Sequence, residues 1–125
     1  MKQTPPLISF ITICYNGLDD TCMLIESLRD TISSVSYEII VVDNASRQDE
    51  ASLIQERYPF VRTLRSEKNL GFSGGNNLGI QIAQGKYLFL INNDTYLTED
   101  GLPALIERLE TPVTLSATSG QVPEA

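Results

Sequence analysis

The chain has 125 residues, of which 42% are hydrophobic, and this size predicts one domain with its own core. Its formal net charge of −7 argues against nucleic-acid binding, because phosphate backbones attract a basic face. The chain has no histidine, which removes the commonest general base and transition-metal ligand, so an anionic nucleotide would need a divalent metal or backbone N–H groups.

Four short segments, rich in β-branched and apolar residues, have the composition of β-strands. Continuous apolar runs, as in the first two segments, are typical of strands that are buried on both faces of a parallel sheet. The third segment alternates polar and apolar residues, so we expect it nearer an edge. In chain order the segments are residues 7–14, 37–43, 61–66 and 86–92.

Apolar residues recur at the helical period after each of these strands. We expect Asp19 or Asp20 to cap the first helix, Pro59 to stop the second, Gly85 to close the third and Pro112 to end the fourth. The periodic stretches are residues 18–32, 53–58, 78–83 and 102–109.

The regular alternation of strands and helices implies right-handed crossovers and a doubly wound, three-layer α/β/α fold with a mostly parallel sheet. We expect residues 1–112 to form the folded unit. Residues 113–125 have no clear period and are expected to be an irregular tail, in which residues 113–115 could add one short strand.

Cys14 and Cys22 fall in apolar contexts and are expected to be buried free thiols, as in a reducing compartment. No stretch resembles a signal peptide, and the longest apolar run is far too short to span a bilayer. We therefore expect a cytoplasmic protein.

Amides or carboxylates follow all four predicted strands, at the edge where an open α/β sheet binds ligands. Tyr15 and Asn16 could line a base pocket, or only form a turn between strand and helix. Asp43 could accept hydrogen bonds from a ribose or from a uracil-like base, or only cap the second helix.

Residues 71–79 are interpreted as a glycine-rich loop that is neither a dinucleotide fingerprint nor a P-loop. Gly74 and Gly75 would let the backbone approach a nucleoside without a Cβ clash, or would only permit a tight turn. Asn76 and Asn77 are expected at the start of the third helix, where their low helix propensity suggests that they hydrogen-bond a ligand.

Asp94 follows the fourth strand, beside Asn92 and Asn93. We expect it to bind Mg²⁺ or Mn²⁺ together with substrate phosphate oxygens, although a lone aspartate also forms turns. A diphosphate leaving group requires a Lewis acid, and the chain has no basic cluster that would replace one.

Three motifs together resemble family 2 of the inverting glycosyltransferases, which have a GT-A fold, and in particular the bacterial rhamnosyltransferase-type members that build surface polysaccharides. The motifs are Val-Asp-Asn-Ala-Ser at 42–46, Asn-Leu-Gly-Phe-Ser-Gly-Gly-Asn-Asn-Leu-Gly at 69–79 and Leu-Ile-Asn-Asn-Asp-Thr at 90–95. The resemblance covers residues 7–110. It implies a Rossmann-like fold that binds a UDP- or dTDP-sugar, a saccharide or lipid-linked acceptor, and Mn²⁺ or Mg²⁺.

By this resemblance Asp43 would contact the base or ribose, Asn69 and Gly74 would frame the nucleoside, Asn92 would lie near the ribose, and Asp94 would bind the metal. The family's Asp-x-Asp motif reads here as residues 92–94 with an amide in first place, which lowers the negative charge at the site.

Family members deprotonate the acceptor with a later carboxylate, but this chain has no aspartate after Asp100, and Glu107, Glu110 and Glu124 are poor candidates. The chain is therefore expected to be the donor-binding half of a longer enzyme, with a non-catalytic nucleotide-binding or interaction module as the alternative. A nucleotidyltransferase is less well supported, because residues 15–18 carry no lysine or arginine. Apolar surface left open by missing strands would favour a homodimer, and the full-length protein would associate peripherally with a membrane.

Overall fold

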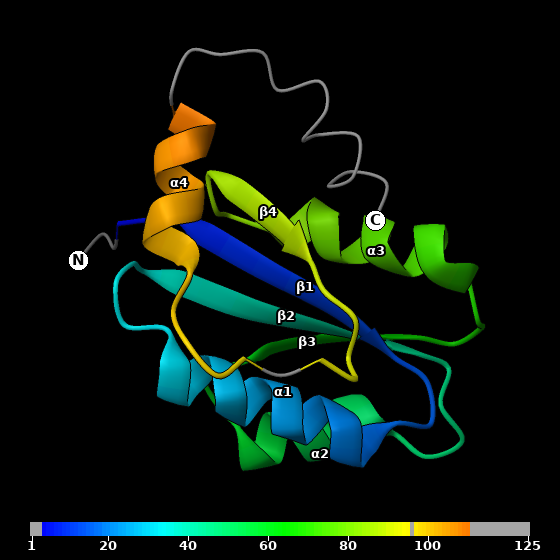
Figure 1. The fold of residues 1–125 in the computed structure, drawn as a ribbon. Helices are drawn as coiled ribbons and strands as arrows, with labels where there is room; N and C mark the ends of the chain where they lie inside the picture. Colours follow the sequence, from blue (N-terminus) through cyan, green and yellow to red (C-terminus); the bar gives the residue numbers. More distant parts are fainter. Residues whose placement is uncertain (1–3, 96, 111–125) are drawn as a thin grey trace.

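The computed structural model describes residues 4–95 and 97–110. Within these residues, four parallel strands alternate with four helices, and the strand order across the sheet is β3-β2-β1-β4 (Figure 1). The elements are β1 (Ile8–Cys14), α1 (Leu18–Thr31), β2 (Tyr37–Asn44), α2 (Glu50–Arg57), β3 (Arg62–Ser66), α3 (Gly71–Ile82), β4 (Tyr87–Leu90) and α4 (Leu102–Glu110).

The helices cover both faces of the sheet, as expected for an α/β/α fold (Figure 1). Successive residues of β1 point to opposite faces of the sheet. Phe10 packs in the larger core with α1, α2 and Leu102 of α4, whereas Ile11 packs in the smaller core beneath α3. A Cβ on Gly79 would lie 2.6 Å from Ile11 Cγ2, so this glycine lets α3 lie close against the sheet. The expected layering and the parallel sheet are confirmed.

The register brings the carboxyl ends of the strands to one edge. Cys14 at the end of β1 lies opposite Asp43, and Asn44 at the end of β2 lies opposite Ser66. The prediction that the third strand is an edge strand is confirmed, and β4 forms the other edge of the described sheet. β4 is shorter than predicted.

Two of the predicted caps are wrong. Gly17 is the N-cap of α1 and provides no side-chain cap, while Asp19 and Asp20 lie in the first turn, where their charge complements the helix dipole. The C-cap of α3 is Ala83 in an extended conformation. Gly85 instead allows a close approach to β1, because a Cβ there would lie 2.6 Å from Ser9 N. The second helix does end at Arg57, just before Pro59.

The segment interpreted as a glycine-rich loop, residues 71–79, instead forms most of α3, which begins at Gly71. That expectation is wrong because packing overrides the low helix propensity of glycine. Gly71 has φ +77°, a left-handed conformation that turns the chain into the helix. A Cβ on Gly75 would lie 2.9 Å from Ile13 Cδ1, so the helix packs closely on β1 at Gly75 and Gly79.

Both cysteines are buried and free, as predicted. Among the described residues, no helix combines the length and apolarity needed to cross a membrane. The expected stop at Pro112, the short strand at 113–115 and the irregular tail all lie outside the described residues.

Candidate functional site

A cavity of about 440 Å³ lies at the carboxyl edge of the sheet, beside the beginning of α3, and we call it the α3 pocket. Amide groups both donate and accept hydrogen bonds, so its walls suit a flat ligand with polar edges. The polar residues that line it are Asn44, Asn69, Asn76, Asn92, Asn93 and Asp94. Its apolar side chains are Ile13, Phe72 and Ile91.

Asp94 enters this pocket from a turn that follows β4. The Ile91 N–H still donates to the Ile11 carbonyl at 2.9 Å, so pairing with β1 holds the chain up to the turn. The turn is closed by the Thr95 N–H, which donates to the Asn92 carbonyl at 3.1 Å. Asp94 is exposed, so its carboxylate is accessible to a ligand or cation in the pocket.

Asn44 joins the end of β2 to the start of α3. Its Oδ1 accepts from the Leu70 N–H at 2.9 Å, and its Nδ2 donates to the Gly71 carbonyl at 3.0 Å. Asn69 supports the same place, because its Oδ1 accepts from the Gly71 N–H at 2.8 Å. The two amides fix the backbone where α3 begins.

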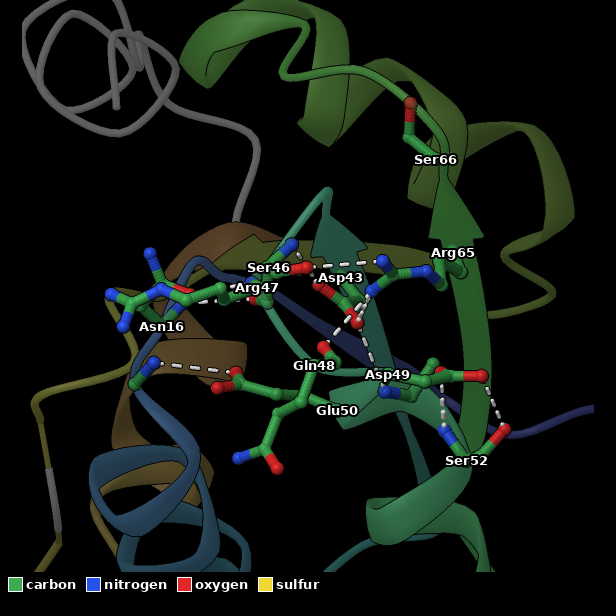
Figure 2. Close-up of polar contacts among 12 residues, drawn as sticks. Asn16, Asp43, Ser46, Arg47, Gln48, Asp49, Glu50, Ser52, Arg65 and Ser66 are labelled. Atoms are coloured by element: carbon green, nitrogen blue, oxygen red, sulfur yellow. Dashed lines mark hydrogen bonds and ion pairs between the residues drawn. The ribbon is translucent and has the colours of Figure 1, made fainter.

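Asp43, the neighbour of Asn44, is fully buried within a different network (Figure 2). Its carboxylate accepts from the backbone N–H groups of Ser46 at 2.9 Å and Ala51 at 3.1 Å, and from Arg65 Nη1 at 2.6 Å. Burial by itself raises the pKa of Asp43, but the hydrogen bonds from Ser46, Ala51 and Arg65 outweigh it and hold the pKa below its ordinary value. Asp43 thus holds the loop between β2 and α2.

Asn16 ties that loop to the end of β1 (Figure 2). Its N–H donates to Ser46 Oγ at 2.9 Å and its Oδ1 accepts from the Arg47 N–H at 2.7 Å. Asn16, after β1, and Ala45, after β2, have positive φ values of 53° and 69°. These backbone conformations are strained, and the hydrogen-bond network maintains them. Asn16 lines a second cavity of about 420 Å³ beside Arg47 and Glu50, and Tyr15 is exposed.

Residues 9–122 match the family model described as glycosyl transferase family 2. The chain belongs to this family. Among curated relatives, this glycosyltransferase family chain is 30% identical over 106 residues to the succinoglycan biosynthesis protein ExoO of Rhizobium meliloti (strain 1021), covering 84% of the chain and 30% of the relative. It is 34% identical over 116 residues to the uncharacterized glycosyltransferase YibD of Escherichia coli (strain K12), covering 89% of the chain and 31% of that relative.

Solved glycosyltransferases share the GT-A fold of this chain. Staphylococcus aureus TarS 1–349 in complex with UDP matches with a TM-score of 0.71 and 23% identity, over 83% of this chain and 32% of that one. The mannosyltransferase PcManGT of Pyrobaculum calidifontis, in complex with GDP-Man and Mn²⁺, matches with a TM-score of 0.74 and 19% identity. This match covers 87% of this chain and 34% of that one. The chain therefore spans about a third of the length of the two relatives and of the two solved chains.

In this glycosyltransferase family chain, three of the predicted site residues meet in the α3 pocket: Asn69, Asn92 and Asp94. Gly74 lets the first turn of α3 close, because a Cβ there would lie 2.6 Å from Leu70 Cβ, and Asn77 is exposed on the helix. The predicted nucleotide-binding residues outside the described lining of the pocket are Tyr15, Asn16, Asp43, Gly74 and Asn77. Their contacts with a nucleotide stay predictions.

Sequence reasoning missed Asn44 as a pocket residue and assigned no role of its own to Asn93. Neighbouring residues of a strand face opposite sides, so only one of Asp43 and Asn44 can face α3. The apolar residues of β2 that pack beneath α3 are Ile40 and Val42, and continuing this alternation points to Asn44. That signal was present in the sequence but depended on knowing which face α3 covers.

A divalent metal has two candidate places among the described residues. Cys14, Asp43 and Glu50 bring ligand atoms within 4.8 Å of one another, but the Arg65 guanidinium already supplies positive charge to Asp43 there. Burial, followed by the charges of Asp43 and Glu50, raises the pKa of the Cys14 thiol, which disfavours the thiolate that a metal needs. The exposed Asp94, with amide oxygens beside it, is the better oxygen ligand set for Mg²⁺ or Mn²⁺.

Proposed function

We propose that this chain is the donor-binding part of an inverting glycosyltransferase, and that the α3 pocket holds the nucleoside diphosphate of a UDP- or dTDP-sugar. The observation that carries this proposal is the meeting of Asn44, Asn69 and Asp94, from the exits of three strands, in one pocket. Family membership supports it, and so do the UDP and GDP-Man complexes of the structural neighbours.

Each part of the pocket suits one part of such a donor. The amides offer donors and acceptors to the edges of a base and to ribose hydroxyls, and the half-exposed Phe72 offers an apolar surface. The N-terminus of α3 opens on the pocket through Gly71 and Phe72, and the positive end of a helix dipole favours a phosphate.

Asp94 is the carboxylate that would hold a divalent metal in this pocket. Mg²⁺ and Mn²⁺ are commonly bound by one or two carboxylates together with substrate phosphate oxygens, and a single Asp94 with neighbouring amide oxygens fits that pattern. When bound, the metal would neutralise negative charge that develops on the departing nucleoside diphosphate. Because Asn92 replaces a carboxylate, we expect the chain to bind metal well only when nucleotide is present.

The acceptor side of the reaction is proposed to lie in a longer protein. Inversion by single displacement requires a carboxylate that takes the proton of the acceptor hydroxyl. In the described part of the chain beyond Asp94, Asp100 is engaged by the N–H groups of Ser33 and Ser34. The full protein is proposed to be a rhamnosyltransferase-like enzyme that acts in the cytoplasm, at a membrane surface, on a polysaccharide or glycolipid. The names of relatives in succinoglycan and teichuronic acid biosynthesis support the polysaccharide part of this proposal.

Calorimetry tests the donor site directly. Titration of UDP and dTDP into the chain should show binding that requires Mn²⁺, and Asp94→Ala should abolish the metal-dependent part. Asp30→Ala is the matched control, because it removes an exposed carboxylate on α1 that forms an ion pair with its neighbour Arg29. Binding that ignores Mn²⁺, or that persists in Asp94→Ala, would refute the proposed metal role.

A second function, a nucleotide-binding module without transferase activity, is favoured by one observation. Asp94 is the one carboxylate that lines the described part of the α3 pocket, which leaves no second carboxylate there to act as a base. An assay with radiolabelled UDP- and dTDP-sugars separates the two functions, because any transfer by the protein excludes a purely binding role.

A further inference from the structure

The described residues of the connection between β4 and α4, 91–95 and 97–101, run beside α1 (Figure 1). They are hydrogen-bonded to this helix at several places. The Leu97 N–H donates to Ser27 Oγ at 3.0 Å, and the Leu97 carbonyl accepts from Thr31 Oγ1 at 3.2 Å. Near the beginning of the connection, Asn93 makes the corresponding contact with the first turn of α1. The segment that carries Asp94 is thus fastened to a helix outside the pocket.

The Asn93 side chain contacts α1 through its amide nitrogen. Nδ2 donates to Thr21 Oγ1 at 3.1 Å and approaches the Gly17 carbonyl oxygen at 3.5 Å. We call these two contacts the Asn93 anchor. The Thr21 hydroxyl has one hydrogen, which it donates to the Gly17 carbonyl at 2.9 Å, so its oxygen can only accept from Asn93. Residue 93 must therefore supply a donor.

Gly17 makes room for this anchor. A Cβ at position 17 would lie 2.8 Å from Asn93 Nδ2, closer than real Cβ contacts. The backbone of Gly17 has φ −140°, which other residues adopt, so the absence of a side chain at this position leaves space for the Asn93 amide and is not needed for the backbone conformation. Sequence position 17 is thereby coupled to position 93, in a different strand exit.

Asn93 and Asp94 are the two central residues of the turn that the Thr95 N–H closes. Fixing the side chain of the first central residue fixes the orientation of the turn and the direction in which the second side chain projects. We propose that Asn93 is a positioning residue, which holds Asp94 toward the α3 pocket through Thr21 and Gly17. The effect of this positioning on metal binding rests on the proposed function of the α3 pocket as the donor site.

The anchor makes a prediction opposite to that of simple charge counting. If residue 93 only contributed oxygen ligands, Asn93→Asp would add negative charge and tighten Mn²⁺ binding. If the Asn93 anchor positions Asp94, Asn93→Asp should instead weaken Mn²⁺ binding, because it replaces a hydrogen-bond donor with an acceptor that faces the Gly17 carbonyl oxygen. The Thr21 hydrogen could satisfy the new carboxylate only by leaving Gly17.

The experiment measures Mn²⁺ affinity of the full chain in the presence of saturating UDP. Partners that orient metal ligands commonly change metal affinity by about 10- to 100-fold, so we expect roughly 10-fold weaker Mn²⁺ binding in Asn93→Ala, Asn93→Asp and Thr21→Val. Gly17→Ala should act in the same direction by displacing the amide. Thr21→Ser keeps the hydroxyl and should therefore retain Mn²⁺ affinity. Ser27→Ala removes a more distant contact of the same connection and should also leave Mn²⁺ affinity unchanged.

A second measurement does not depend on nucleotide. The ¹⁵N order parameters of Asp94 and Thr95 should fall from about 0.85 to below about 0.6 in Asn93→Ala and Thr21→Val, but not in Thr21→Ser. Unchanged order parameters would overturn the anchor, whether or not UDP binds. A mobile turn with unchanged Mn²⁺ affinity, or tighter binding in Asn93→Asp, would overturn the positioning role. Absence of Mn²⁺–UDP binding in the unsubstituted chain would instead overturn the proposed function.

Discussion

Arg65 Nη1 contacts Asp43 Oδ2 at 2.6 Å, and the Asp43 side chain is completely buried. The same guanidinium donates to the carbonyls of Ser46 and Gln48, so one residue of an edge strand supports the whole loop between β2 and α2. This relationship explains why an aspartate at a strand exit serves the scaffold, while its neighbour Asn44 faces the pocket.

Removing one member of this pair should destabilise the fold. Arg65→Met leaves the buried Asp43 carboxylate without its cation, and breaking a buried pair typically costs about 3–5 kcal/mol; the partial exposure of Arg65 places our expectation near about 3 kcal/mol. Urea unfolding measures the loss. Arg29→Met, in the exposed pair with Asp30, is the control and should change the free energy of unfolding by less than about 1 kcal/mol. Equal effects of both substitutions would contradict the structure.

The same carboxylate should make stability depend on pH. The pKa of Asp43 is lowered in the folded state, so its stabilising contribution is present above the unfolded value of about 3.9 and is lost as the pH falls through the folded pKa. The free energy of unfolding should therefore decline below about pH 4. Urea unfolding between pH 3 and pH 7 checks this, and Asp43→Asn should flatten the decline; an equally steep decline in that variant would assign it to other groups.

Asn44→Ala should loosen the start of α3. Two hydrogen bonds, from the Leu70 N–H and to the Gly71 carbonyl, are lost, and each contributes about 0.5–1.5 kcal/mol. We expect a loss of about 1–2 kcal/mol in urea unfolding, together with weaker Mn²⁺-dependent UDP binding. Ser52→Ala, which removes an exposed contact with Asp49 on α2, should leave UDP binding unchanged. Full UDP affinity in Asn44→Ala would show that α3 needs no such support.

The close packing of α3 should make Gly79 sensitive to a single methyl group. A Cβ there would meet Ile11 Cγ2 at 2.6 Å, and overpacking of this kind costs about 1–3 kcal/mol. Gly101→Ala is the matched control, because a Cβ at position 101 meets no atom within 4 Å. Thermal or urea unfolding of the two variants should differ clearly, and equal stability would mean that α3 does not lie as close to β1 as described.

The sequence was sufficient to predict the strands, because apolar runs and the alternation of the third strand are local signals. Their parallel direction followed from the alternation of strands with helices. The sequence also placed Asn69, Asn92 and Asp94 at one edge, since the exits of parallel strands meet there. The beginning of α3 could not be predicted in this way. Its helical state depends on the turn at Gly71 and on the fit of Gly75 and Gly79 against the sheet, which are tertiary contacts.

Individual side chains at the site were harder to assign than the site itself. Asp43 and Asn44 are adjacent and chemically similar, and only the placement of α3 decides which one reaches the pocket. In the Asn93 anchor, Asn93 contacts Gly17, which lies 76 positions earlier in the chain. No short-range pattern in the sequence predicts such a contact.

The most direct test of the donor site is the place at which Mn²⁺ binds when UDP is present. Mn²⁺ broadens nearby NMR signals, so a ¹H–¹⁵N spectrum of the chain with UDP and substoichiometric Mn²⁺ reports that place residue by residue. We expect selective loss of the signals of Asn92, Asp94 and the first turn of α3, and no such loss in Asp94→Ala. Broadening centred on Cys14 and Glu50, or the same loss in Asp94→Ala, would contradict the account.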